Sequence, residues 1–335
     1  QGPAYVLHCW VKDDHTKALK RFGAVLIVVL GLVALYTLLY GYVYDLGSGA
    51  QDWRDAFRRG ARGDFSLVVT PYWVLLLSFV PAQLPEPLGY ALWIGSGAVL
   101  VVLAAMHFHS PLWFVLLSYQ LNWCLFYGQA DLYVVFGIAL GHWAYQNAKP
   151  ATIGAAILLL LIKPQLGLLP SLVLLWWSPN RKVTLLVIVA VVLLSLILWP
   201  GWPMTLVCKW TTFTEQPENI FSNTSLHLPW WLAAVLSSAV LIIPLDSERK
   251  LLALVAAGLL VSPYSPVYSH LALLCFALPM PFYIFALIPW IVAVVAGPFN
   301  HWAWMALFPI SVLLYCYIPL LWASVVSNLR GRHGV

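Results

Sequence analysis

The sequence predicts an all-α protein built almost entirely from membrane helices, and three observations support this prediction. Hydrophobic residues make up 62% of the chain and charged residues only 9%, whereas a soluble domain carries roughly 25% charged residues. The mean hydropathy is +0.86. Apolar runs of bilayer length recur from end to end, and unpaired backbone groups are costly in lipid. We therefore predict a polytopic protein with about 11–13 transmembrane or re-entrant helices.

Composition narrows this class further. The 18 Trp and 16 Tyr suit aromatic belts at the two membrane interfaces, and the 23 Pro and 21 Gly predict broken or re-entrant helices. The net charge of +5 is read as a topology signal, because no basic patch with interleaved aromatics points to nucleic acid. The five Cys are scattered without a CxxC pair, so they favour neither a metal site nor a disulfide framework. No cofactor is expected.

Basic clusters predict the topology. Lys17, Lys20 and Arg21 precede the first span and place segment 1–21 in the cytoplasm, and the basic tail 328–335 is placed there too. Residues 22–327 form one integral-membrane domain. Its main external loops are 45–67 and 201–228. We thus expect a multi-pass plasma-membrane protein with both termini cytoplasmic and its functional face outside.

The apolar segments leave two topologies open for residues 68–178. If "IKPQ" (162–165) is an external turn between two short helices, then "YGQAD" (127–131) is external as well, and one earlier segment fails to cross. The candidate is 68–83, which Pro71 and Pro81 bracket. If 151–178 is one continuous span, every segment crosses and "YGQAD" lies inside. We favour the first topology, because it gathers the polar residues on one face.

The loop 45–67 carries an unusual density of charges of both signs. At helical spacing Trp53 and Phe57 share one face, while Arg54, Arg58 and Arg62 share another. This pattern predicts an amphipathic helix in the headgroup region. Solvated acids and lipid-binding arginines explain most of it, but Asp52 precedes the helix and equally suits a general base beside a cavity.

Lys163, in "LLLLIKPQLGLLP", needs a reason to sit within an apolar run, because a charge at mid-bilayer costs roughly 2.5–3.5 kcal/mol. It either reaches an interface or a carbonyl freed by Pro164, or it faces an anion in a cavity at a helix break. We favour the second interpretation.

Weaker candidates complete the set of polar residues. His270 follows an external turn, where a lone His is more often structural. Gln129 and Asp131 flank a turn, and Asp131 suits the first turn of a helix. Asn223-Thr224-Ser225 matches a glycosylation sequon in a loop that also suits an ordered lid.

Taken in order, these segments resemble the polyprenol-phosphate-mannose-dependent α-mannosyltransferases, integral-membrane enzymes of the GT-C glycosyltransferase fold. The family's Asp–aromatic pair after the first span corresponds to Asp52-Trp53, followed by Ala56, Phe57 and Gly60. Further matches are the Pro-containing helix start "TPYWVLLLSFVPAQLP", the "GQ…G…KP" run from Gly128 to Pro164, "NTSL" at 223–226, and Ser262-Pro263 before His270. The matches cover about residues 50–275 and most of the chain.

The resemblance implies a GT-C-like fold and an inverting, metal-independent transfer of a sugar, with mannose expected, from a polyprenyl-phosphate donor to an extracytoplasmic lipid or glycan acceptor. Asp52 would be the catalytic base. Lys163, His270 and Arg58 would bind the donor phosphate, and Gln129, Asp131, Asn223, Ser225 and Asp55 would line the substrate cavity. Asp55 and Asp64 compete with Asp52 for its role. The family commonly has Asn where this chain has Asp131.

Other functions remain open. A transporter of lipid-linked substrates would place charges near the midplane of several spans, whereas here they gather towards one face. A non-catalytic homologue, or an accessory subunit with a partner in a membrane complex, would share the hydrophobicity without requiring Asp52, Lys163 and His270 to converge.

Overall fold

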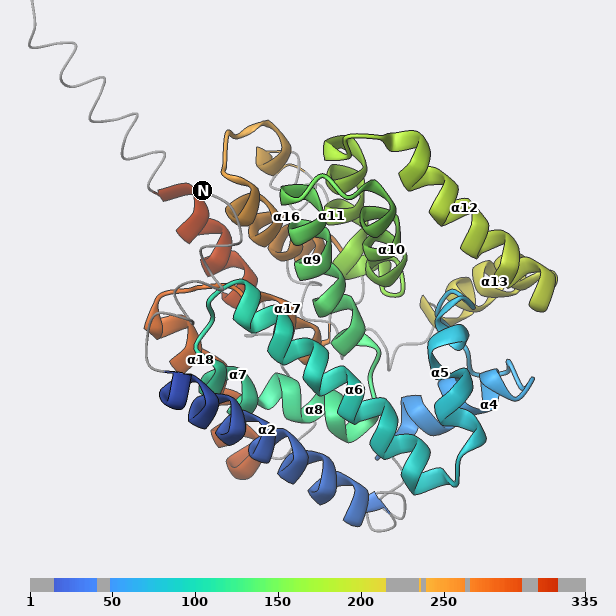
Figure 1. Cartoon of the computed structure of the whole chain (residues 1–335), viewed down its shortest axis with the longest axis horizontal. Coiled ribbons are helices and arrows are strands. Elements are labelled where there is room, and N and C mark those ends of the chain that lie inside the picture. Colours follow the sequence, from blue (N-terminus) through green and yellow to red (C-terminus); the bar gives the residue numbers. More distant parts are fainter. Residues whose placement is uncertain are drawn as a thin grey trace, which may run out of the picture.

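The computed structural model describes residues 15–40, 49–214, 235, 239–262, 266–296 and 307–318. Within these ranges the secondary structure is helical apart from an isolated bridge between His109 and Phe276, so the all-α prediction is confirmed (Figure 1). The helices are α2 (His15–Leu38), η1 (Asp52–Arg58), α4 (Arg59–Ala61), α5 (Val74–Gln83), α6 (Glu86–His107), α7 (Leu112–Leu117), α8 (Tyr119–Tyr127), α9 (Asp131–Gln146), α10 (Pro150–Leu160), α11 (Pro164–Trp177), α12 (Arg181–Leu198), α13 (Trp202–Thr214), α16 (Ser247–Val261), η2 (Val267–His270), α17 (Leu271–Leu274), α18 (Met280–Ala296) and Leu307–Ile318.

Helix α9 lies at the centre of the packing. It contacts α6, α10 and α11, and α11 in turn packs on α16 (Figure 1). Residues on several sides of α9 are buried, among them Leu132, Val135 and Ile138. The glycines Gly137 and Gly141 let α10 and α11 approach it closely. The N-terminal end of this central helix is therefore held in a fixed position.

Most of the apolar helices that the structure describes are shorter than a full membrane span. In the described part of the chain, α6 and α12 are long and apolar enough to cross a membrane by length and composition. Other apolar helices have 10–17 residues, because polar residues and prolines divide the apolar runs. The run 111–127 is split where Ser118 adopts an extended backbone and caps α8 by accepting a bond from the Leu121 amide.

The break at "IKPQ" was predicted in the favoured topology, and the structure confirms it. Helix α10 ends at Leu160, and α11 begins at Pro164, whose ring is tolerated at the first helical position. Segment 151–178 is thus two helices rather than one continuous span.

Two expectations about the loops need correction. The apolar face of the helix at 52–61 does not lie in headgroups, because Trp53 and Phe57 are fully buried against Trp93 of α6. The segment 201–228 is not simply a loop, since its first part forms α13. There Trp202 stacks on Tyr72 and meets Trp73 edge-on, which seats α13 beside the connection between α4 and α5 (Figure 1).

The close approach of α11 to α10 gives a stability prediction. A Cβ on Gly167 would lie 2.0 Å from the carbonyl oxygen of Leu160, and backbone cannot move aside as a side chain can. Gly167→Ala is therefore expected to destabilise the fold by roughly 2–4 kcal/mol or to prevent folding. Thermal unfolding of the detergent-purified protein would measure this. Gly31→Ala is the matched control, because its Cβ meets nothing within 4 Å, and a loss of stability like that of the first variant would contradict the prediction.

Candidate functional site

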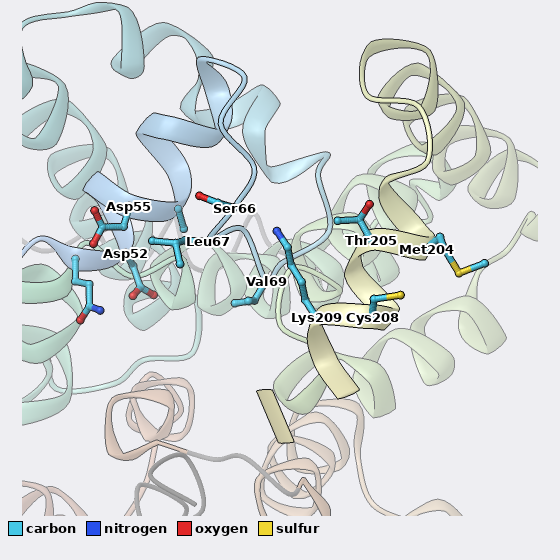
Figure 2. Close-up of a pocket in the computed structure, with 11 residues that line it drawn as sticks. Asp52, Asp55, Ser66, Leu67, Val69, Met204, Thr205, Cys208 and Lys209 are labelled. Carbon is cyan, nitrogen blue, oxygen red and sulfur yellow. The ribbon is translucent and has the colours of Figure 1, made fainter. Parts of the chain in front are cut away.

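A cavity of about 780 Å³ lies between η1, the connection from α4 to α5, and α13. Figure 2 shows Asp52 and Asp55 on one side, Lys209 and its neighbours on the other, and Leu67 between them. The lining residues are Gln51, Asp52, Asp55, Ala56, Ser66, Leu67, Val69, Met204, Thr205, Cys208 and Lys209. The cavity thus combines acidic, basic, hydroxyl and apolar groups.

Hydrogen bonds and packing of the residues around Asp52 fix its position at this cavity. The Ala50 amide donates to the carbonyl of Phe126 over 2.7 Å, and the Trp93 indole donates to the carbonyl of Gly128 over 2.8 Å. Gly128 adopts a φ of +69°, and a Cβ there would lie 2.6 Å from the Trp53 side chain. The "GQ" turn therefore packs directly on the residue after Asp52. Helix η1 has π-helical geometry. Such helices are rare in proteins, and those that occur are often found at functional sites.

Behind Asp52 lies a buried polar cluster formed by Gln129, Asp131 and Lys163. Lys163 Nζ donates to Gln129 Oε1 over 2.7 Å and forms an ion pair with Asp131 Oδ2. Asp131 Oδ1 accepts from the Ser269 hydroxyl over 2.7 Å, and the Tyr268 ring lies 4.8 Å from the Lys163 ammonium. Because Asp131 neutralises it, Lys163 has the pairing that a buried charge requires.

Asp52 connects the cavity to this cluster. Desolvation by burial is the main cause that raises the pKa of Asp52 to about 6, and the charge of Asp131 adds to the rise. The Lys163 ammonium and a hydrogen bond from Gln129 lower it in part. A carboxylate with this pKa is ionised at neutral pH, yet it is a stronger base than an exposed aspartate.

The two competing acids are unsuited to the same task. Asp55 lines the cavity, but Arg54 donates hydrogen bonds to both of its carboxylate oxygens, with Nε–Oδ1 at 2.8 Å and Nη2–Oδ2 at 2.9 Å. Asp64 is exposed, and hydrogen bonds from Ser66 hold its pKa below the usual value. Of these three carboxylates, Asp52 is the one whose surroundings strengthen it as a base.

The structure does not bring Arg58 and His270 to the cavity. Arg58 Nη1 lies 3.6 Å from Glu86 Oε1, at the start of α6. His270 is fully buried with its ring 6.0 Å from that of Phe308, and among the described residues neither ring nitrogen has a hydrogen-bond partner. Its neighbour Ser269, rather than the imidazole, contacts the cluster. Lys163 is likewise absent from the cavity lining, and so are Gln129 and Asp131, which were expected to line it.

Two further candidates for the cavity lining lie in the segment 201–228, and so does one cavity residue that was not predicted from the sequence. Asn223 and Ser225 lie outside the described residues. Lys209 was not predicted, because 201–228 was taken as a loop; it lines the cavity from α13 and donates to the carbonyls of Phe65 and Val68.

A resident metal has no ligand set in the described ranges. No group of three His, Cys, Asp or Glu side chains comes together there in a way that could hold a metal ion. The chemistry available to the cavity from these residues is thus that of a carboxylate base, an amide, hydroxyls and an ammonium.

Comparisons of the chain with models of protein families, with curated proteins and with solved structures find no match.

Proposed function

We propose that the protein is a multi-pass membrane glycosyltransferase that moves a sugar, with mannose expected, from a polyprenyl-phosphate donor to an extracytoplasmic lipid or glycan acceptor. One observation carries the proposal. The aspartate expected to be the base lies in the cavity lining, with its pKa raised to about 6 and its side chain bonded to Gln129. Raised carboxylate pKa values in clefts are typical of acid–base catalysts.

The packing supports the favoured topology. Gln129 and Lys163 are in direct contact, so the turn at 127–131 and the break at 161–163 adjoin each other, which supports placing both on the same side of the membrane. Helix α5 has ten residues and is about 15 Å long, half of a hydrocarbon core. It suits the segment that does not cross. Helix α12 is apolar and only 11% of its spanning window is buried, as expected for a lipid-facing helix.

The reaction follows from the groups available. The acceptor hydroxyl attacks the anomeric carbon of the donor, the bond from that carbon to the phosphate oxygen breaks, and Asp52 takes the hydroxyl proton. The products are the inverted glycoside and the polyprenyl phosphate anion. Asp52 thus provides the base, and the leaving phosphate needs a cation rather than a proton.

The direct test is transfer of radiolabelled mannose from polyprenyl-phosphate-mannose to membrane lipid and glycan acceptors, with purified protein in vesicles. Transfer by the wild type with inversion of the anomeric centre supports the proposal. Transfer by neither the wild type nor Asp52→Asn across a panel of acceptors would overturn it and favour the accessory-subunit alternative.

The pKa of Asp52 gives a pH prediction. Only the ionised carboxylate can accept the proton, so kcat/KM is expected to rise with pH, reach half its maximum near about 6 and level off above it. An unperturbed aspartate would place this midpoint near about 3.9. The measurement is the pH profile of initial transfer rates at low donor concentration. A flat profile between about pH 5 and 8 would contradict the assignment of the base.

A further inference from the structure

Lys209 lies on a face of α13 that lines the cavity. Met204, Thr205, Cys208 and Lys209 share that face, because residues three or four positions apart are neighbours on a helix. Figure 2 shows the lysine side chain reaching from α13 towards the Ser66–Val69 segment, across the cavity from Asp52. Met204, Leu67 and Val69 give this end of the cavity apolar surface.

Among the described residues Lys209 forms no ion pair; the charge of Asp64 acts on it, but that exposed carboxylate is hydrogen-bonded to Ser66. The Lys209 ammonium donates to two backbone carbonyls, those of Phe65 and Val68, and a lysine has three donors. Both acceptors are uncharged. The acids on the opposite side are otherwise engaged, Asp55 by Arg54 and Asp52 by Gln129. Lys163, by contrast, already has the carboxylate of Asp131.

We propose that Lys209 binds the phosphate of the lipid-linked donor, so that the cavity has a donor end at α13 and an acceptor end at η1. The proposal rests on the proposed function and gives Lys209 the phosphate-binding role that the resemblance implied for Lys163, His270 and Arg58. The ligand is a phosphate ester of an apolar alcohol, whose first hydrocarbon units would lie on Leu67, Val69 and Met204.

This arrangement suits an inverting displacement. The base and the leaving group must lie on opposite sides of the anomeric carbon, and Asp52 and Lys209 lie on opposite sides of the cavity (Figure 2). A preorganised ammonium beside the departing oxygen stabilises the negative charge that grows on the phosphate. Lys209 forms no bond to the sugar in this scheme and transfers no proton.

The test uses the whole chain with two substitutions of Lys209 and one control substitution. Lys209→Gln keeps an N–H donor for the carbonyls of Phe65 and Val68 but removes the charge, while Lys209→Arg keeps the charge. Lys182→Gln is the matched control, because Lys182 is exposed on α12 and remote from the cavity lining. We expect Lys209→Gln to weaken binding of farnesyl phosphate by at least about tenfold and to raise the donor KM by a similar factor. In Lys209→Gln, the acceptor KM and the affinity for uncharged farnesol should change by less than about threefold. In Lys209→Arg and Lys182→Gln, the farnesyl phosphate affinity and the donor KM should also stay within about threefold of wild type.

Several outcomes separate the hypotheses. Equal farnesyl phosphate affinity in wild type and Lys209→Gln, at similar melting temperatures, would overturn the assignment even if mannose transfer occurs. Loss of this binding in Lys209→Gln with no transfer by the wild type would retain the phosphate site and reject the transferase. Competition by inorganic phosphate at the same concentration as farnesyl phosphate would reject a lipid-linked ligand, because the apolar end would then contribute nothing.

Discussion

Replacing Asp52 with asparagine is expected to slow mannose transfer by about 10²–10⁴-fold and to make the protein more stable above neutral pH. The amide keeps the shape of the side chain but cannot accept a proton, and loss of a positioned general base typically costs about 10²–10⁴ in rate. The expected readout is a fall of that size in kcat, with the donor KM changed by less than about threefold. Single-turnover transfer measurements would separate this from slow product release.

The stability effect follows from the raised pKa. The pKa rises from 3.8 to about 6 in the folded state, so the folded protein disfavours the ionised form. The stabilisation that Asp52 confers when protonated is complete below about pH 3.8 and is lost as pH rises through about 6. Two pKa units at about 1.4 kcal/mol each give up to roughly 3 kcal/mol in favour of Asp52→Asn at about pH 8.

Thermal unfolding of wild type and Asp52→Asn at several pH values would measure this. The two melting temperatures should coincide at acid pH and separate as the pH passes about 6. Asp55→Asn is the control, since Asp55 is half-buried and held by Arg54; it should show no comparable gain. A destabilised Asp52→Asn at alkaline pH would mean that the carboxylate is a structural partner rather than a strained base.

Sequence patterns predicted the parts of the site that depend on local rules. The four-residue spacing of Trp53 and Phe57 indicated one apolar face, and both side chains are buried. The pair Lys163-Pro164 indicated a helix break, because proline is tolerated at the first position of a helix but not in its interior. These patterns could not predict what the apolar face of η1 packs against. In the structure Trp53 packs against Trp93 of α6, whereas lipid headgroups were expected.

The pairing of the charges was beyond local pattern. Asp131 lies in the first turn of a helix, as expected, but it was also expected to line the cavity and Lys163 to face a ligand; instead the two form one ion pair. Such a contact joins two segments distant in sequence and depends on how α9 packs against α10 and α11. Lys209 did leave a signal, since Pro203 at the second position of α13 is typical of a helix start. Pro203 thus indicated that a helix begins within the segment expected to be a loop.

The ion pair of Lys163 with Asp131 gives the second large effect. Lys163→Met leaves a buried carboxylate unpaired, and breaking a buried pair in this way costs about 3–5 kcal/mol. Asp131→Asn alone removes the carboxylate that forms the ion pair with the Lys163 ammonium and is expected to cost a similar amount. Combining the two removes both charges while asparagine can still accept from the Ser269 hydroxyl. The double variant should therefore be more stable than either single variant, with a coupling of roughly 1–3 kcal/mol in unfolding measurements.

The same double variant decides between two roles for Lys163. If the lysine holds the structure, a folded double variant should keep its donor KM within about threefold of wild type. Its pH midpoint should stay at about 6 or rise above it, because Lys163 lowers the pKa of Asp52 by more than Asp131 raises it. If the lysine binds the donor phosphate, the donor KM should rise by at least about tenfold while the melting temperature recovers. The ion pair with Asp131 favours the structural role, since a carboxylate already occupies the position that a phosphate would need.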